Sequence, residues 1–211
     1  MLPSPKWQRR SESRPQEILD AALALFAEKG FAATRMDEIA ARAGVTKGTI
    51  YLYFESKERI FRALIAGSIG TTLAEMEERV AQFRGPAGEL VRVVLTAVGA
   101  FLITSDRVVL PKVVIAEAGN FPEIVKFYRE EIIDRGLKIL AGIVTRGIES
   151  GEFRKIDPQH AARLVIAPLL LCAFWRTTFA QFDAAPYDYQ GLIATHIDVL
   201  LKGLSAGKGA P

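Results

Sequence analysis

Apolar residues recur along this chain at intervals of three and four, the spacing that places them on one face of an α-helix. The first clear stripe comprises Ile18, Ala22, Leu25 and Phe26, and Gly30 marks its end. No stretch shows the strict alternation of apolar and polar residues that is typical of a half-buried β-strand. The pattern therefore predicts an all-α fold.

Glycine, proline and helix-capping residues divide the chain into successive helical segments. Gly67 and Gly70 interrupt the fourth segment, and the sequence GPAG at 85–88 is the clearest break after it. The expected helices lie near residues 14–29, 34–43, 46–54, 56–83, 88–104, 106–118, 122–150, 158–182 and 189–204.

One short stretch, TRMDEIAARAGVTKGTIYLYF at 34–54, has the pattern of a helix, a tight turn and a second helix. Ala40 is small enough to let the two helix backbones approach, and Ile50 returns from the second helix to the same core. Gly44 falls where the turn needs a left-handed residue, and Thr46 is suited to capping the second helix. The spacing predicts a helix-turn-helix.

This arrangement leaves Lys47, Thr49, Tyr51 and Tyr53 on or beside the solvent-facing surface of the second helix. A short helix that presents a cation, hydroxyl groups and aromatic rings has the size and chemistry to enter the major groove of DNA. The sequence therefore indicates a DNA-binding surface.

Together with the Ser-Lys-Glu that follows at 56–58, the motif resembles the DNA-binding domain of TetR-type transcriptional regulators. A shorter segment, EAGNFPE at 117–123, resembles the AefR-like subclass of C-terminal domains. The resemblance implies a homodimeric, all-helical repressor whose second domain binds a small molecule. It implies DNA contacts at Arg35, Thr46, Lys47, Gly48, Thr49, Tyr51, Leu52, Tyr53 and Lys57.

Some of these contacts have a clear physical basis. Gly48 has no Cβ, so its backbone can approach a phosphate, and Lys57 would act as a point charge on phosphate. Either Tyr51 or Leu52 can pack against a thymine methyl group, and Leu52 is apolar where a polar reader would be usual, so the motif does not fix a detailed base preference.

The charge distribution agrees with this assignment. The 211-residue chain carries a net charge of +3, and residues 1–62 hold eleven Lys/Arg against eight Asp/Glu. The remaining residues hold sixteen of each, so the basic excess lies with the helix-turn-helix, as phosphate binding requires.

The expected domains follow from these segments. We expect a helix-turn-helix domain at 14–60 and a helical effector-binding and dimerisation domain at 61–204, with disordered tails at 1–13 and 205–211. The first tail is basic; it either tracks DNA phosphates or remains a solvated, charged segment.

The candidates for effector contacts lie in the predicted second domain. They are aromatic residues on its helices and charged residues that stand next to apolar runs. They are Phe101, Glu117, Phe121, Tyr128, Trp175 and Arg176. The aromatic residues could equally be core packing, and Glu117 and Arg176 could reach solvent or form a structural ion pair. We expect a mainly apolar or amphipathic effector.

Two reading helices spaced by the DNA helical repeat would recognise a palindrome, which requires a dimer. The segments 158–182 and 189–204 are the candidates for the interface because they are more apolar than a single internal stripe requires. The expected contact residues are Leu164, Leu169, Ala173, Ile193, Ile197, Leu200 and Leu201.

The sequence contains no motif for metal binding, cofactor binding or catalysis. His160 and His196 have no neighbouring ligands at metal-binding spacing, and the chain has no phosphate loop, nucleophile elbow or paired carboxylates. We therefore expect no metal, no cofactor and no enzyme activity. An architectural DNA-binding protein without an effector is the alternative; it would lack a cavity and would bind DNA sequences indiscriminately.

Cellular location is indicated by two further features. The single cysteine, Cys172, excludes an intramolecular disulfide and suits a reducing compartment. The N-terminus is polar, and the longest apolar run, 164–175, is too short for a membrane span and contains Pro168. We expect a cytoplasmic protein without a membrane segment.

Overall fold

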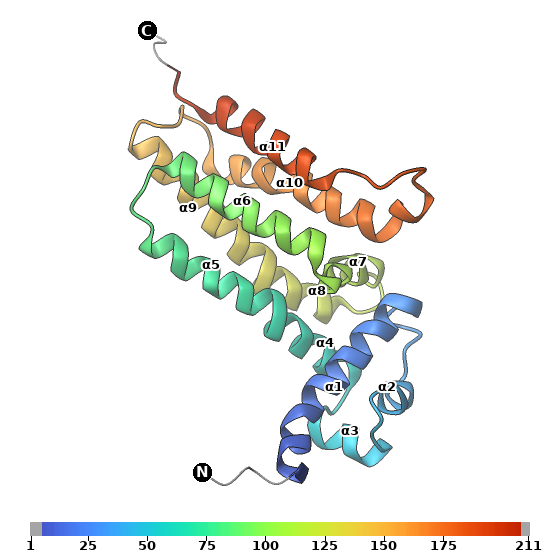
Figure 1. Cartoon of the computed structure of the whole chain (residues 1–211). Coiled ribbons are helices and arrows are strands. Elements are labelled where there is room, and N and C mark those ends of the chain that lie inside the picture. Colours follow the sequence, from blue (N-terminus) through green and yellow to red (C-terminus); the bar gives the residue numbers. More distant parts are fainter. Residues whose placement is uncertain (1–5, 208–211) are drawn as a thin grey trace. The chain divides into compact units, whose positions relative to one another are not determined.

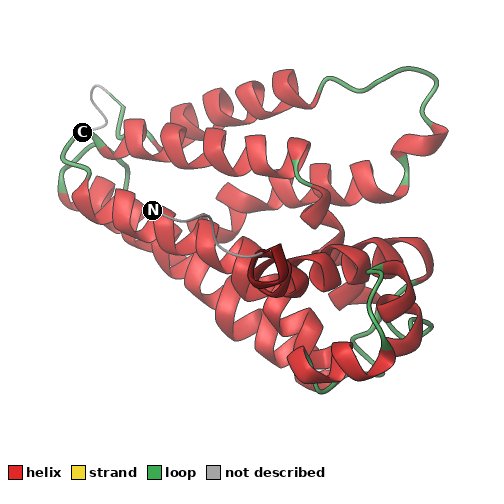
Figure 2. Ribbon diagram, turned by 60° about the horizontal axis from the view of Figure 1, so that its bottom comes forward, coloured by secondary structure: helices red, strands yellow, loops and turns green. Residues whose placement is uncertain are grey.

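The computed structural model describes residues 6–207, with side chains described from residue 13 onward. Every regular element of this part of the chain is a helix, as predicted (Figure 2). The α-helices are α1 (Lys6–Lys29), α2 (Met36–Arg42), α3 (Lys47–Tyr53), α4 (Lys57–Ile65), α5 (Thr71–Gln82), α6 (Ala87–Thr104), α7 (Val109–Ala116), α8 (Pro122–Tyr128), α9 (Arg135–Glu149), α10 (Pro158–Thr178) and α11 (Tyr189–Leu204) (Figure 1). Single turns of π-helix at Ala66–Gly70 and Arg129–Asp134 and of 3-10 helix at Asp106–Val108 and Ala180–Phe182 join some of them.

The two predicted tails differ from the structure. Helix α1 begins at Lys6, so residues 6–13 are helical rather than disordered, and Pro15 lies inside the helix. The sequence placed the start at Pro15 because proline lacks the amide that would continue the hydrogen-bond ladder. At the other end, Ser205 pairs with Phe153 in an isolated β-bridge. The first residue of the predicted C-terminal tail is therefore bonded to the rest of the chain. Residues 1–5 and 208–211 lie outside the described residues.

The chain forms two compact units. Unit 1 contains the residues up to Ile69 together with Val109–Tyr128, and unit 2 contains Gly70–Val108 and the residues from Arg129 onward. The division after Ile69 lies nine residues beyond the predicted boundary. Helices α7 and α8 belong to unit 1, although the sequence analysis assigned them to the second domain.

The core of unit 1 is built around phenylalanine rings. Phe26, Phe31 and Phe61 are fully buried, with ring centroids 5.1 to 6.1 Å apart in tilted and edge-to-face arrangements. The predicted stripe of α1 is buried against them, and Ile39 of α2 and Ile50 of α3 are also inaccessible to solvent. Aromatic pairs of this kind hold short helices together because each ring covers a large apolar area.

The core of unit 2 is mainly aliphatic, and α6 packs against α9, α10 and α11 (Figure 1). Two glycines allow close packing there. A Cβ at Gly99 would lie 2.7 Å from Cδ1 of Ile193, and a Cβ at Gly147 would overlap the ring of Phe153. A side chain at Gly147 would force the Phe153 ring to move, and one at Gly99 would force the end of Ile193 to shift.

Helices α6 and α10 are long and apolar enough to cross a membrane by length and composition alone. Both contribute buried residues to the core of unit 2, including Leu95 of α6 and Leu169 of α10. The core helices of globular proteins can have the same composition, and the buried residues of α6 and α10 in unit 2 account for part of it.

Candidate DNA-binding surface and effector-domain residues

The helix-turn-helix is built as the spacing predicts. Ala40 and Ile50 are buried, and Gly44 has a φ of +66°, the left-handed conformation that favours glycine. Oγ1 of Thr46 accepts a hydrogen bond of 3.1 Å from the amide of Thr49, so Thr46 caps α3. These contacts hold α3 against α2 and leave its opposite face free.

The free face of α3 carries most of the predicted DNA contacts. Leu52 is 84% exposed and Tyr51 is 45% exposed, and Lys47 and Gly48 are also exposed. Thr49 and Tyr53 are half-buried at the edges of this face. The surface is therefore mixed, with a cation, a phenol and a large apolar side chain next to one another.

An open cleft of about 410 Å³ lies beside α3. Its wall is formed by the N-terminal residues of α2, by α3 and by the N-terminus of α4: Thr34, Arg35, Met36, Asp37, Lys47, Tyr51, Glu55, Ser56, Lys57 and Glu58. Ser56 caps α4, because its hydroxyl accepts a hydrogen bond of 3.4 Å from the amide of Arg59, and this helix start lines the cleft. The N-terminus of a helix favours anions.

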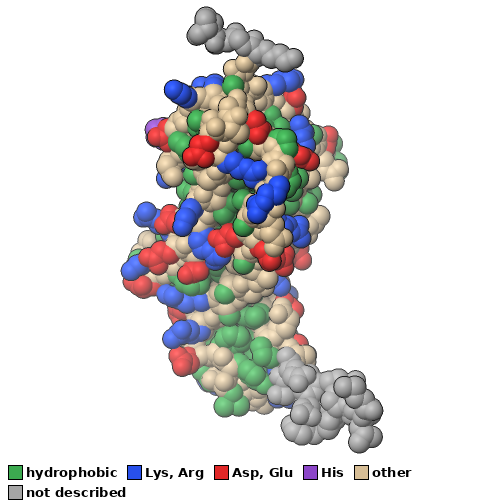
Figure 3. Space-filling model, turned by 90° about the vertical axis from the view of Figure 1, so that its left-hand side faces the viewer, with side chains coloured by type: hydrophobic (Ala, Val, Ile, Leu, Met, Phe, Trp, Pro, Cys, Tyr) green, Lys and Arg blue, Asp and Glu red, His purple; other side chains and the backbone are tan. Residues whose placement is uncertain are grey.

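The charges at the cleft are of both signs. Nζ of Lys47 lies 3.1 Å from a carboxylate oxygen of Asp37, and both side chains are mainly exposed. An exposed ion pair of this kind is weak, so a phosphate can replace Asp37 as the partner of Lys47. Lys/Arg and Asp/Glu side chains are similarly interspersed on the face of the molecule in Figure 3.

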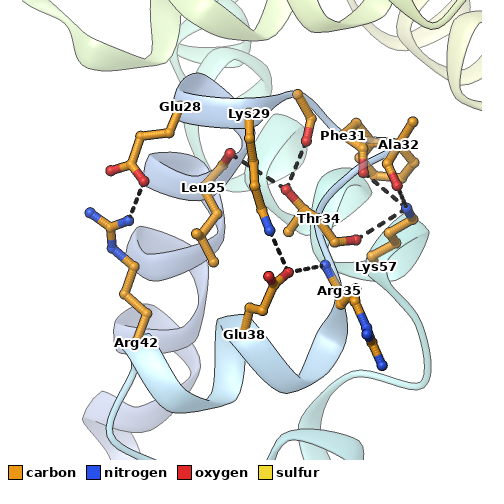
Figure 4. A network of polar contacts seen from close by, with 11 residues as sticks. Leu25, Glu28, Lys29, Phe31, Ala32, Thr34, Arg35, Glu38, Arg42 and Lys57 are labelled. Carbon is orange, nitrogen blue, oxygen red and sulfur yellow. Dashed lines mark hydrogen bonds and ion pairs between the residues drawn. The ribbon is translucent and has the colours of Figure 1, made fainter.

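A polar network, which the sequence analysis did not anticipate, ties α2 to the end of α1 (Figure 4). Glu38 lies 2.5 Å from Nζ of Lys29 and accepts a hydrogen bond of 2.8 Å from the amide of Arg35. The Lys29 ammonium, helped by the Arg35 amide, holds the pKa of the Glu38 carboxyl below its ordinary value. The buried hydroxyl of Thr34 donates a hydrogen bond of 2.7 Å to the carbonyl of Gly30. These bonds fix the start of α2, where Arg35, a predicted DNA contact, precedes the first residue of the helix.

Lys57 is placed differently from the expectation. Its ammonium donates hydrogen bonds to the carbonyl oxygens of Phe31 (2.9 Å), Ala32 (3.0 Å) and Thr34 (3.2 Å), as Figure 4 shows. An ammonium has three donors, and all three are used within the protein. We therefore correct the role predicted for Lys57: it binds the α1–α2 turn rather than presenting a free charge to phosphate.

Three of the six candidate effector residues lie in unit 1. The Glu117 carboxylate is buried and accepts hydrogen bonds from the amide of Ala32 (2.9 Å) and from Nδ2 of Asn120 (3.2 Å). The ring of Phe121 packs edge-on against Phe31 at 4.9 Å, and burial raises the pKa of Tyr128 far above its ordinary range. Glu117 and Phe121 therefore have structural contacts with the α1–α2 turn, and an effector contact at Glu117, Phe121 or Tyr128 stays a prediction.

The other three candidates lie in unit 2. Arg176 donates hydrogen bonds to the carbonyl oxygens of Leu102 (2.8 Å) and Ser105 (3.1 Å), so it caps the C-terminal end of α6. The Arg176 guanidinium therefore has hydrogen-bond partners within the protein, and its partial burial does not require a ligand. Nε1 of Trp175 donates to Asp183 at 3.0 Å, and Phe101 is half-buried. An effector contact at Phe101 or Trp175 stays a prediction.

The predicted dimer residues fall into two groups. Leu169, Ala173, Ile193 and Ile197 are buried in the core of unit 2, so they cannot contact a partner subunit, and the prediction for them is wrong. Leu200 and Leu201 are partly buried, whereas Leu164 is 62% exposed. The exposed apolar residues of the two helices include Leu164, Leu170, Leu171, Phe174 and Val199. Since α10 is apolar on all sides, the sequence did not show which face turns inward.

The isolated titratable groups have structural surroundings. Nε2 of His196 lies 2.8 Å from the carbonyl oxygen of Val165. Cys172 is buried, and this burial raises the pKa of its thiol. Among the described residues, no group of three or more His, Cys, Asp or Glu side chains could hold a metal ion.

Family comparisons cover both parts of the chain. The family described as bacterial regulatory proteins, tetR family, matches residues 18–64. The family described as AefR-like transcriptional repressor, C-terminal domain, matches residues 89–202, which is more than half of the chain.

Individual relatives match nearly end to end. The fatty acid metabolism regulator protein of Bacillus subtilis is 30% identical over 196 residues, covering 92% of this chain and 97% of that protein. The transcriptional repressor KstR2 of Rhodococcus jostii is 29% identical over 168 residues, covering 78% and 81%. The crystal structure of FadR from B. subtilis in complex with stearoyl-CoA superimposes with a TM-score of 0.73 at 28% identity, covering 90% of this chain and 98% of that one. The chain therefore belongs to the TetR family of bacterial regulatory proteins, with an AefR-like C-terminal domain, and is a helix-turn-helix transcriptional regulator.

Proposed function

We propose that this protein is a cytoplasmic, ligand-responsive repressor that binds a palindromic operator as a homodimer and releases it when a mainly apolar effector binds. The observation that carries the proposal is the exposed face of α3, which is held rigidly on a buried core and flanked by the start of α4. The sign, repression, is supported by the AefR-like repressor family and by the name of the related KstR2.

On this proposal α3 lies in the major groove. Tyr51 and Leu52 contact base edges, Leu52 through thymine methyl groups, and Thr49 and Tyr53 bond to the groove edge. Lys47 exchanges its exposed Asp37 partner for a phosphate. Gly48 has no atom other than Oγ1 of Thr46 near its missing Cβ, at 3.9 Å, so its backbone is open to a close phosphate.

Further phosphate contacts come from the residues beside α3. Arg35 lines the cleft, and the hydroxyl of Thr46 is exposed next to its capping interaction. We do not include Lys57, because its ammonium is fully engaged by three carbonyl oxygens.

We propose that the exposed apolar face of α10 and α11 joins two subunits. Leu164 and Leu171 are each 62% exposed, and Val199 of α11 is 63% exposed. Several exposed large apolar side chains on two neighbouring helices are costly in water and are typical of a subunit interface. Pairing two copies by a two-fold axis would present two copies of α3 to a palindrome.

The first effector candidate is a long-chain acyl-CoA. The related FadR structure contains stearoyl-CoA, whose acyl chain is apolar and whose headgroup is charged, in agreement with the amphipathic effector expected from the sequence. The alignment with the B. subtilis fatty acid metabolism regulator covers 92% of this chain. The similarity therefore extends over the expected effector domain as well as the helix-turn-helix.

The experiment is selection of binding sites from random duplex DNA by the purified dimer, followed by titration of the selected duplex with stearoyl-CoA. We expect a palindromic site and at least a tenfold loss of affinity at saturating stearoyl-CoA, with free coenzyme A as the matched control. Selection of no common site would contradict operator binding. Unchanged affinity with stearoyl-CoA would exclude this effector, and a panel of other apolar compounds would then be the next test of ligand control.

A further inference from the structure

Helices α7 and α8 form part of unit 1, although they are separated from α4 in the sequence by two longer helices. The chain enters this pair through the 3-10 turn Asp106–Val108 and leaves it through the π-helical turn Arg129–Asp134. The remaining connection between the units lies at a third irregular turn, Ala66–Gly70. Every crossing between the units therefore occurs at or beside a break in regular α-helix, where hinges are common.

The turn between α7 and α8 is bonded directly to the turn between α1 and α2. Glu117 accepts the amide of Ala32 at 2.9 Å, a bond between residues 85 positions apart in the sequence. Phe121 covers the edge of Phe31 at 4.9 Å. The α1–α2 turn thus receives one of its few long-range hydrogen bonds, and part of its apolar cover, from the α7–α8 turn.

The same contacts continue to α4. The Lys57 ammonium bonds to three carbonyl oxygens of the α1–α2 turn and lies 4.7 Å from the ring centre of Phe31 and 5.4 Å from that of Phe121. One turn later, the guanidinium of Arg62 lies 4.6 Å from the ring centre of Phe127 on α8. The starts of α2 and α4, which both line the cleft beside α3, are therefore attached to one segment.

We propose that Glu117 and Phe121 are positioning residues for DNA binding. They do not touch DNA; they hold the α1–α2 turn and, through Lys57, the N-terminus of α4, so that both ends of the cleft keep the geometry that phosphates require. This inference rests on the proposed DNA-binding function. On this proposal, the α7–α8 turn determines whether the DNA-binding surface has the geometry that binds DNA. The turn belongs to the segment Val109–Tyr128, which is part of unit 1 and is joined in sequence to unit 2 at both ends.

The test compares four variants of the 211-residue protein. Glu117→Leu removes the acceptor and the charge, Glu117→Gln removes the charge but keeps an oxygen that can accept the Ala32 amide, and Glu123→Leu removes the same charge from an exposed position on α8. Phe121→Leu keeps apolar volume but removes the ring. Each variant is measured for affinity toward the duplex selected by the wild-type protein, and for amide hydrogen exchange at Ala32.

A pure charge effect and a positioning effect have opposite signs here. Removing a carboxylate near DNA favours binding electrostatically, so Glu123→Leu should bind as tightly as the wild type or slightly more tightly. Removing the buried Glu117 carboxylate takes away the acceptor of the Ala32 amide and loosens the α1–α2 turn, so Glu117→Leu should bind about tenfold more weakly and exchange faster at Ala32. Glu117→Gln should restore affinity to within about threefold of the wild type, and Phe121→Leu should weaken binding by about threefold or more.

Several results would overturn the proposal. Affinity for Glu117→Leu equal to that for Glu123→Leu would do so, as would equal loss in Glu117→Gln and Glu117→Leu. If Glu117→Leu does not fold, an unchanged affinity for Phe121→Leu would overturn it alone. If the wild-type protein selects no duplex, the proposed function fails instead, and Ala32 exchange still decides whether Glu117 holds the α1–α2 turn.

Discussion

The two units of this protein are stabilised in different ways. Unit 1 joins short helices through a cluster of phenylalanine rings and a network of hydrogen bonds to turns, in which Lys57, Glu38 and Glu117 each bond to backbone groups. Unit 2 packs longer aliphatic helices, with glycines at close approaches, and exposes apolar residues such as Leu164 and Leu171. Its side-chain bonds to backbone groups include those of Arg176 and Glu152, which cap the two ends of α6.

This difference agrees with the surfaces proposed for the two units. A surface that contacts phosphates and base edges needs side chains and helix ends fixed to a fraction of an ångström, and polar contacts to backbone groups supply that. A surface that joins subunits needs apolar area, which aliphatic helices supply without directional contacts. The following substitutions, from the largest expected effect to the smallest, test whether the two units differ in this way.

The largest effect is expected from the aromatic core of unit 1. Phe61→Ala should lower the free energy of unfolding by about 3–5 kcal/mol, because Phe61 is fully buried between Phe26 and Phe31. Urea denaturation measures the loss. The control is Leu52→Ala on the exposed face of α3, which should change stability by less than about 0.5 kcal/mol. Equal losses for the two variants would contradict the burial of Phe61.

A smaller effect is expected at the exposed face of α10. Leu171→Glu should weaken self-association by about 2 kcal/mol, roughly thirtyfold, because it places a charge in the proposed interface. Sedimentation equilibrium measures this, and the subunit should keep its helical content. The neighbouring Leu169→Ala should instead lower stability by about 2–5 kcal/mol, since Leu169 is buried in the core of unit 2. Unchanged association of Leu171→Glu would place the interface elsewhere.

The smallest effect concerns acid stability of unit 2. Burial alone would raise the pKa of Glu152, but its bonds to the amides of Ala87 (2.9 Å) and Gly88 (3.1 Å) outweigh burial and hold the pKa below the ordinary value. A depressed pKa in the folded state means that this stabilisation is present above the unfolded-state pKa, near 4.3, and is lost as pH falls through the folded-state pKa.

Glu152→Gln should therefore flatten the fall in stability between about pH 6 and pH 3, with a loss of up to about 1 kcal/mol at neutral pH. Thermal denaturation across this pH range measures it, with Glu149→Gln at an exposed site of α9 as the control. A pH dependence equal to that of the wild type would show that Glu152 does not cap α6 in solution.

Local spacing was enough to predict the helix-turn-helix. The roles of Ala40, Gly44, Thr46 and Ile50 depend on neighbours within ten residues, so the sequence alone indicates them. The helical segments were predictable for the same reason, because the 3.6-residue period and the capping residues are local signals.

Long-range contacts could not be predicted in this way. Glu117 meets Ala32 across 85 residues, and no pattern near either residue indicates the other. Lys57 occupies the position of a phosphate contact in the motif, and only the folded α1–α2 turn shows that its three donors are already used. In α10, apolar residues surround the helix, so periodicity did not distinguish buried Leu169 from exposed Leu171.

The central claim is that the exposed face of α3 reads a particular DNA sequence. The direct test is a competition titration in which the selected duplex and an unrelated duplex of equal length compete for the wild-type protein and for Tyr51→Ala at a fixed salt concentration. The account predicts a preference of at least about a thousandfold for the selected duplex in the wild type, reduced about tenfold or more by Tyr51→Ala. Equal affinity of the wild type for both duplexes would contradict the account and would favour an architectural DNA-binding protein.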